Sequence, residues 1–197
     1  MTDELYKKIV LQASELPDLR VFIPMLTGEP FCDKKIMTRL RFAREKLPRT
    51  LIEIYTNGSL LTEDIARELK AISGLRISVS LNAATPLTRE WIMGLSDYQN
   101  VVESIKYMEE LGLPVRTTMV DYPGIEPDEI ATFLDAGGMC IQYQSWCGEQ
   151  YPYDRKRRTS CPRAMNYMTI LYTGEVCLCC FDPVSYTHLT LPTILLV

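Results

Sequence analysis

Seven cysteines are spread unevenly along the chain, and four of them lie within the stretch from Cys161 to Cys180. Thiolates bind zinc ions and iron–sulfur clusters. In a reducing compartment such a concentration therefore indicates a metal site or a catalytic site before it indicates disulfides. Apolar and polar residues alternate on both sides of Thr173 and Gly174, which predicts a β-hairpin with its turn at these two residues. In its second strand Cys177 and Cys179 would share one face, and Cys180 would point to the other.

Polar residues suited to ligand binding occur in three short segments, TGEP (27–30), YTNG (55–58) and SLNA (80–83). Glu29 lies in a tight turn, where its carboxylate can accept hydrogen bonds from an ammonium group, and Gly28 lets a ligand approach the backbone closely. Ser80 and Asn82 would share one face of a strand end and could bond a ribose or a carboxylate. Taken alone, each segment is more often an ordinary turn or strand cap.

Several common catalytic and nucleotide-binding motifs are missing from the sequence. His188 is the single histidine, which argues against a Ser-His-Asp triad or a histidine general base. Neither GxGxxG nor GxxxxGK(S/T) occurs, so dinucleotide and P-loop binding have no support. An enzyme of this composition must take its reactivity from a bound cofactor.

The elements that would position these residues alternate between strand and helix. Helical spacing predicts helices over 3–16, 33–47, 61–73, 86–94, 97–112 and 126–138, with Asp33 and Thr62 as caps of the second and third. Apolar runs predict strands over 19–26, 50–58, 75–83, 113–121 and 139–146. This order predicts an α/β fold with parallel strands, either a barrel or an open doubly wound sheet. In both, functional residues lie beyond the carboxyl ends of the strands, so the three polar segments should meet at one rim.

Composition narrows the possible partners. Hydrophobic residues make up 47% of the 197 residues, and the net charge of −4 lacks the basic excess of a nucleic-acid-binding protein. Residues 1–20 lack the apolar region of a secretory signal, and no apolar run reaches the roughly 18 residues of a membrane span. We therefore expect a cytoplasmic protein with no nucleic-acid or membrane partner.

The ordered set TGEP, YTNG and SLNA on successive strand ends, followed by a cysteine-rich extension, resembles the radical S-adenosylmethionine (SAM) family over residues 3–182. The resemblance implies a partial (β/α)6 barrel that binds SAM. Its GEP motif, which holds the methionine amino group of SAM, matches Gly28, Glu29 and Pro30. Ser80 and Asn82 match positions that contact the SAM ribose or carboxylate, and Asn57, with Thr56, is a weaker candidate at the preceding strand end.

The cysteine-rich segment has its own family resemblance. Cys161, twelve residues, Gly174, four residues and Cys179 resemble the CX9-15GX4C opening of the SPASM extension, which holds auxiliary 4Fe–4S clusters. The resemblance implies Cys161 and Cys179 as metal ligands. Of the remaining cysteines, Cys147 can supply a further thiolate, Cys177 and Cys180 are alternate ligands or, preferably, small buried residues, and Cys32 and Cys140 are interpreted as core cysteines. A zinc site built from the same thiols is the alternative.

The sequence also departs from the family. No three cysteines have the CX3CX2C spacing that holds the SAM-cleaving cluster, so we expect the chain to be a piece of a longer enzyme. Residues 184–197 contain no Asp, Glu, Lys or Arg and are interpreted as a non-native tail. The predicted organisation is a partial radical SAM barrel over 1–150, the start of a SPASM-like iron–sulfur extension over 151–183, and this tail.

Two functional hypotheses follow. In the first, the intact enzyme cleaves SAM to a 5′-deoxyadenosyl radical that abstracts hydrogen from a substrate, with a peptide or protein side chain as the leading substrate class. The fragment alone should be inactive, and its catalytic residues are not identified. In the second, the chain is a non-catalytic module whose thiols hold a structural zinc ion. The metal bound after anaerobic purification distinguishes the two.

Overall fold

The computed structural model describes residues 1–143, 166–177 and 180. The chain divides into two compact units. One comprises Lys7–Tyr143, and the other comprises Met1–Tyr6 together with Gln144–Val197. We describe each unit by itself. The predicted domain boundaries at residues 150 and 183 fall outside the described residues and stay predictions.

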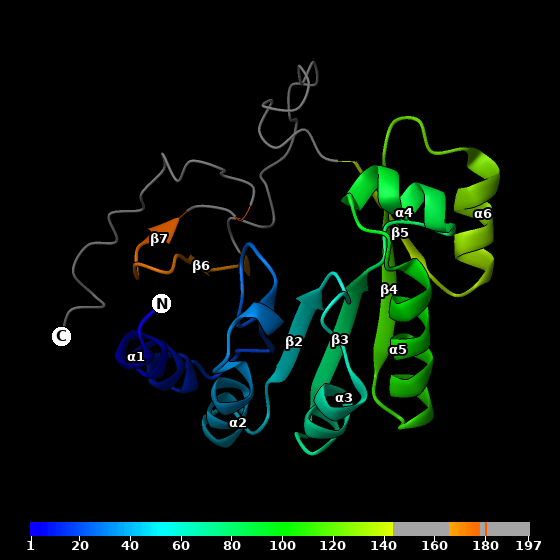
Figure 1. Cartoon of the computed structure of the whole chain (residues 1–197). Coiled ribbons are helices and arrows are strands. Elements are labelled where there is room, and N and C mark those ends of the chain that lie inside the picture. The colour runs from blue at the N-terminus through cyan, green and yellow to red at the C-terminus, as the bar shows by residue number, and fades with distance from the viewer. Residues whose placement is uncertain (144–165, 178–179, 181–197) are drawn as a thin grey trace, which may run out of the picture. The chain divides into compact units, whose positions relative to one another are not determined.

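The larger unit is built on a five-stranded sheet in which every neighbouring pair is parallel and the spatial order follows the chain order (Figure 1). The strands are β1 (Val21–Phe22), β2 (Leu51–Thr56), β3 (Leu75–Ser80), β4 (Val115–Asp121) and β5 (Met139–Gln142). Within the described residues β1 and β5 are the sheet edges, so the sheet is open there. The α/β fold with parallel strands is therefore confirmed.

Helices connect the strands, as the periodicity predicts. They are α1 (Asp3–Ser14), α2 (Ile36–Lys46), α3 (Glu63–Lys70), α4 (Pro86–Met93), α5 (Tyr98–Glu110) and α6 (Pro127–Asp135). Thr62 caps α3 as predicted, because its hydroxyl accepts a hydrogen bond from the Ile65 N–H. Thr85 caps α4 in the same way through the Thr88 N–H, and Gly94 ends that helix in the left-handed conformation.

The predicted cap at Asp33 is wrong. A 3-10 turn, Pro30–Cys32, takes up the Asp33 N–H, so α2 begins only at Ile36. The Asp33 carboxylate instead accepts the Lys35 N–H at 2.9 Å and pairs with Arg39 at 2.7 Å. The side chain therefore fixes the link between the turn and the helix.

The first strand is shorter than the predicted 19–26. Val21 and Phe22 pair with Leu51 and Ile52, and strand pairing ends there. Pro24 has no N–H to donate, which explains why the apolar run does not continue as a strand.

Alternation along the strands gives the sheet two different faces. One face carries Ile52 and Ile54 of β2 and Ile77 and Val79 of β3, all with fully buried side chains. Helix α5 packs on this side, since Val101 and Val79 both crowd the space beside Gly58. Figure 1 shows α2, α3 and α5 lined up along the sheet. The opposite face carries Glu53, Tyr55, Arg76, Ser78, Ser80 and Arg116, and we call it the polar face.

The described part of the smaller unit contains the predicted hairpin. Strands β6 (Thr169–Ile170) and β7 (Val176–Cys177) pair antiparallel, with Thr169 opposite Cys177. The turn is closed by the Leu171 N–H to the Glu175 carbonyl at 2.8 Å, and Gly174 has a φ of +97°. A position with this φ favours glycine, so the predicted turn is confirmed.

In the part of the chain that the structure describes, none of the helices combines the length and the apolar character that crossing a membrane would require.

Candidate functional site

The TGEP segment forms a loop that places Glu29 beside the end of β2. Gly28 has a φ of +88°, which glycine adopts without strain, and no atom of the described residues lies within 4 Å of where a Cβ would be. Glu29 caps the 3-10 turn Pro30–Cys32, with Pro30 at its first position. The backbone beside Gly28 is therefore open to a ligand.

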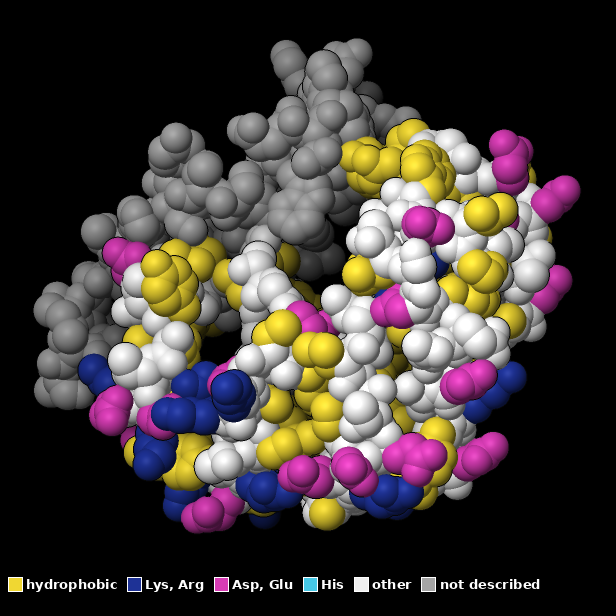
Figure 2. Space-filling view, viewed as in Figure 1, with side chains coloured by type: hydrophobic (Ala, Val, Ile, Leu, Met, Phe, Trp, Pro, Cys, Tyr) yellow, Lys and Arg dark blue, Asp and Glu magenta, His cyan; other side chains and the backbone are white. Residues whose placement is uncertain are grey.

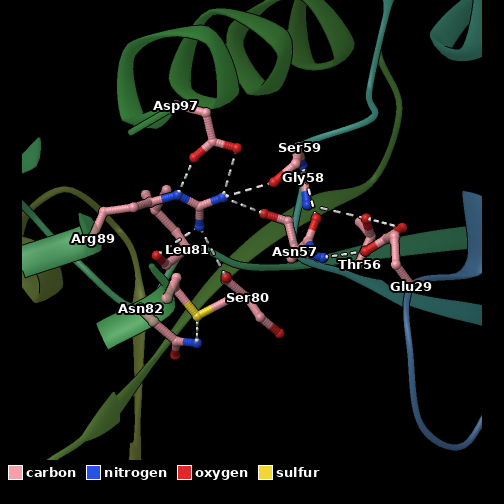
Figure 3. A network of polar contacts seen from close by, with 11 residues as sticks. Glu29, Thr56, Asn57, Gly58, Ser59, Ser80, Leu81, Asn82, Arg89 and Asp97 are labelled. Carbon is pink, nitrogen blue, oxygen red and sulfur yellow. Dashed lines mark hydrogen bonds and ion pairs between the residues drawn. The ribbon is translucent and has the colours of Figure 1, made fainter. Parts of the chain in front are cut away.

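The Glu29 carboxylate is held by three donors, of which Figure 3 shows Thr56 and Asn57. One oxygen, Oε1, accepts the Thr56 hydroxyl at 2.7 Å and the Phe31 N–H at 3.2 Å. The other, Oε2, accepts the backbone N–H of Asn57 at 2.8 Å. These bonds fix the orientation of the carboxylate and join the TGEP loop to the end of β2. Because Oε2 accepts only one of them, it can still accept a further donor.

The YTNG segment turns sharply at the end of β2. The Thr56 hydroxyl accepts the Gly58 N–H at 3.0 Å, and Asn57 Oδ1 accepts the Ser59 N–H at 2.9 Å. Gly58 has a φ of +86°, and a Cβ there would lie 2.6 Å from Val101 Cγ1. The Asn–Gly pair is thus required by the turn and by helix packing, while the side-chain nitrogen of Asn57 makes no hydrogen bond in the described structure.

The SLNA segment differs from the prediction that Ser80 and Asn82 share one face of a strand. The strand β3 ends at Ser80, and Asn82 adopts the left-handed conformation with a φ of 56°. The Asn82 amide is engaged, since Oδ1 accepts the Val120 N–H at 3.1 Å and Nδ2 contacts Met93 Sδ at 3.2 Å. Asn82 therefore joins the end of β3 to β4, whereas the Ser80 hydroxyl makes no hydrogen bond within the described residues.

Sequence reasoning missed Arg89, which lies between these segments (Figure 3). Its side chain is fully buried, and its guanidinium donates to the carboxylate of Asp97 at 2.7 Å and to the carbonyls of Asn57 at 2.8 Å and Leu81 at 3.0 Å. The hydrogen bonding of Arg89 to this carboxylate holds the pKa of Asp97 below its ordinary value. Arginine is usually exposed, so only Asp97 further along the chain could have hinted at a buried pair.

The loops 27–30, 56–59 and 80–83 thus meet at one edge of the sheet, which we call the strand-end rim. Glu29 links the first loop to the second, and Arg89 links the second to the third. The predicted residues Gly28, Glu29, Pro30, Asn57, Ser80 and Asn82 all belong to these three loops. The predicted convergence of the three segments is confirmed.

The polar face of the sheet carries a second group of charges that the sequence did not reveal. Glu53, nearly buried, lies 2.6 Å from the guanidinium of Arg116 and 3.7 Å from that of Arg76. Arg116 also donates to the Ser78 hydroxyl at 2.9 Å and to the Tyr55 hydroxyl at 3.0 Å. Burial raises the pKa of Tyr55, and the neighbouring Glu53 raises it further. Tyr55 is thus a neutral hydrogen-bonding group at neutral pH.

Aromatic rings gather where β4 and β5 end. Tyr122 meets Trp91 edge-to-face with ring centroids 6.0 Å apart, and it meets Tyr143 in the same manner at 4.8 Å. Trp91 on α4 is more than half exposed. Figure 2 shows hydrophobic side chains over α4 and the nearby end of β5, whereas charged side chains line the margin formed by α2, α3 and α5.

The cysteines divide between the described and the remaining residues. Cys161, Cys179 and Cys147 lie outside the described residues, so their predicted roles as metal ligands stay predictions. The interpretation of Cys32 and Cys140 as core cysteines is wrong, because Cys32 is exposed on the 3-10 turn and Cys140 is only half-buried on the edge strand β5. Desolvation, with a smaller contribution from Asp121, raises the pKa of the Cys140 thiol.

Cys177 is buried, in agreement with its preferred interpretation as a small buried residue, and Cys180 is half-buried. Among residues 1–143, 166–177 and 180, no three potential metal-ligating side chains come together.

A sequence model of the radical SAM superfamily matches residues 1–136. The GTP 3′,8-cyclase of Peptoclostridium acidaminophilum is 35% identical over 108 residues, which cover 54% of this chain and 33% of that protein. A probable GTP 3′,8-cyclase of Pyrococcus horikoshii is 31% identical over 138 residues, covering 70% of this chain and 43% of the relative. The chain thus spans less than half the length of these curated relatives.

Solved structures share the fold at low sequence identity. SuiB of Streptococcus suis bound to its precursor peptide SuiA superimposes with a TM-score of 0.72 at 16% identity, covering 94% of this chain and 54% of SuiB. Native anSMEcpe with bound AdoMet superimposes with a TM-score of 0.54 at 17% identity, covering 72% of this chain and 43% of that protein. At these identities the likeness concerns the fold.

Proposed function

Since the chain belongs to the radical SAM superfamily, we propose that it is part of a radical SAM enzyme and that its strand-end rim binds SAM. The observation that carries the proposal is the carboxylate of Glu29, which is oriented by Thr56 and Asn57 beside the open backbone of Gly28. An oriented carboxylate next to open space suits the ammonium group of a ligand.

The remaining rim groups suit the rest of SAM. Its methionine part carries an ammonium and a carboxylate, and its ribose carries two hydroxyls. Oε2 of Glu29 can accept from the ammonium, while the Ser80 hydroxyl and the Asn57 side-chain nitrogen are available for the carboxylate or the ribose. Pro30 fixes the turn below Glu29, and Asn82 stays a predicted contact whose amide already bonds Val120.

The residues present do not fit the SAM-cleaving iron–sulfur cluster, because no cysteines in the chain have the CX3CX2C spacing. No step through that cluster is assigned to this chain. Bound SAM would supply a 5′-deoxyadenosyl radical only after one-electron reduction, with methionine as the other product, and the residues of this chain do not hold the cluster that would give this electron. The part assigned to this chain is to bind SAM and to orient it on the rim.

Direct binding tests the assignment of Glu29. Equilibrium dialysis with labelled SAM should show binding that Glu29→Gln weakens at least about tenfold, since it removes the charge that faces the ammonium. Glu68→Gln is the matched control, because Glu68 is an exposed carboxylate on α3 paired with Arg41. Equal affinities for the parent chain and Glu29→Gln would refute the role of this carboxylate.

For the substrate we propose a peptide or protein side chain. The fold matches SuiB, whose structure contains a precursor peptide, over 94% of the chain. The exposed ring of Trp91, packed on Tyr122 beyond the end of β4, offers an apolar contact for peptide side chains. A nucleotide is the second candidate, because the curated relatives are named GTP 3′,8-cyclases.

Binding experiments distinguish the two substrate classes. Retention of apolar peptides by the chain, with loss of retention in Trp91→Ala, supports a peptide substrate. Retention of GTP that is unchanged in Trp91→Ala supports a nucleotide and overturns the peptide proposal.

For the auxiliary metal we propose an iron–sulfur site with Cys161 and Cys179 as ligands, supported by their CX12GX4C spacing. After anaerobic reconstitution, Cys161→Ala and Cys179→Ala should each lower the iron content, and Cys32→Ala and Cys140→Ala should not. Stoichiometric zinc without iron would favour the structural zinc module instead. Equal losses in all four variants would indicate general destabilisation.

A further inference from the structure

Arg89 occupies an unusual place for a charged residue. It lies on α4, its side chain has no exposed surface, and it belongs to the core together with the apolar residues around it. Burying a guanidinium is costly unless its donors are satisfied. Asp97 balances the charge through hydrogen bonds at 2.7 and 3.3 Å, which use Nε and one side of Nη2.

The other donors of Arg89 point to backbone at two strand ends. Nη2 donates to the Asn57 carbonyl at 2.8 Å and contacts Ser59 Oγ at 3.3 Å. Nη1 donates to the Leu81 carbonyl at 3.0 Å and lies 3.4 Å from that of Ser80. The planar guanidinium therefore spans from the end of β2 to the end of β3, as Figure 3 shows.

Both anchored backbones carry groups that the proposed function assigns to SAM. The Asn57 carbonyl belongs to the peptide unit that joins Asn57 to Gly58, and the N–H of Asn57 itself donates to Oε2 of Glu29. Leu81 stands directly after Ser80. A shift of either carbonyl would therefore change the distance between Glu29 and Ser80.

We propose that Arg89 is the positioning residue of the strand-end rim, and that it sets the separation between the Glu29 carboxylate and the Ser80 hydroxyl on which ligand binding depends. This inference rests on the proposed function of the rim. Arg89 does not touch the ligand, because its side chain is fully buried. It acts through the Asn57 and Leu81 carbonyls.

The chain offers a matched control at the opposite end of the same strands. Arg44 on α2 donates to the Thr50 carbonyl at 2.7 Å and to the Gly74 carbonyl at 2.9 Å. Thr50 and Gly74 directly precede β2 and β3. Arg44 and Arg89 thus both link β2 to β3 through backbone carbonyls, Arg89 at the rim and Arg44 at the opposite end of the strands.

The test compares Arg89→Lys with Arg44→Lys. Lysine keeps the positive charge but lacks the fork that reaches two carbonyls at once. Arg89→Lys should weaken SAM binding at least about tenfold, the loss expected when one charge-assisted hydrogen bond fails. Arg44→Lys should leave SAM binding unchanged even where it lowers the melting temperature as much.

Amide hydrogen exchange provides a second readout that needs no ligand. In Arg89→Lys the Asn57 N–H should exchange about tenfold faster, because its partner carboxylate and its own backbone are no longer held. In Arg44→Lys its exchange should match the parent chain.

The outcomes separate this inference from the proposed function. If the parent chain does not bind SAM, the proposed function fails, and the exchange of the Asn57 N–H alone decides the role of Arg89. Unchanged SAM affinity in Arg89→Lys, or equal weakening by both lysine variants, would overturn the assignment of Arg89. So would unchanged exchange at Asn57 in Arg89→Lys.

Discussion

Two Arg–Glu pairs in this protein have the same separation and very different surroundings. Arg116 lies 2.6 Å from Glu53, whose side chain is 7% exposed, and Arg41 lies 2.6 Å from Glu68, with both side chains about half exposed. Replacing the arginine by methionine removes the charge and keeps much of the side-chain volume. Arg41 hydrogen-bonds Glu68 directly, whereas Arg116 also donates to Ser78 and Tyr55. The two substitutions therefore compare a largely buried pair with an exposed pair at the same separation.

The expected losses differ several-fold. Arg116→Met leaves the Glu53 carboxylate buried, and breaking a buried pair costs about 3–5 kcal/mol. Arg76 remains 3.7 Å from Glu53 and offsets part of this, so we expect a loss near the lower limit, about 3 kcal/mol. Arg41→Met breaks an exposed pair, which is worth about 0–1 kcal/mol. At about 2–4 °C per kcal/mol, the melting temperature should fall by roughly 6–12 °C in the first variant and by at most about 4 °C in the second.

Thermal and urea unfolding monitored by circular dichroism measures both variants. A third variant, Arg116→Met with Glu53→Leu, should be more stable than Arg116→Met alone, because the uncompensated charge is gone. Equal losses in Arg116→Met and Arg41→Met would refute the conclusion that burial governs the polar-face pair. A double variant less stable than the single one would refute the role of the stranded carboxylate.

Three further substitutions test other features of the larger unit. Both glycines have a positive φ, but a Cβ at Gly58 would in addition collide with Val101. In urea unfolding Gly58→Ala should therefore destabilise the protein by about 1–3 kcal/mol more than Gly28→Ala, and equal losses would contradict this. Thr62→Ala should cost about 1 kcal/mol of unfolding free energy through the lost cap of α3, and Thr62→Ser should recover most of it; a loss that serine does not recover would argue against the cap. Because the pKa of Asp97 is lowered in the folded state, its carboxylate contributes stability that is present above its ordinary pKa and is lost as the pH falls through the lower folded value. Asp97→Asn should therefore be less stable than the parent chain at pH 7 and should lose less stability below about pH 4. The same loss of stability at acid pH in both proteins would contradict this assignment.

Local patterns in the sequence were sufficient for the architecture. Apolar runs of strand length alternating with helical spacing predicted five parallel strands, and the structure has them in chain order. The cap at Thr62 and the turn at Gly174 were also predictable, because each depends on residues within three or four positions. Convergence of the TGEP, YTNG and SLNA segments followed from the rule that parallel strands end at the same edge.

The contacts that shape the site could not be predicted in this way. Arg116 meets Tyr55 from 61 positions away, and Arg89 meets Asn57 from 32 positions away. A charged residue is assigned to the surface by default, and it is buried only where distant parts of the chain supply its partners. Asn82 was likewise placed on a strand face, but the Val120 N–H holds its side chain and its backbone turns left-handed. Periodicity indicates which face of a helix or strand is apolar. Whether a buried polar group finds hydrogen-bond partners depends instead on residues that are distant in the sequence, and a local pattern does not identify them.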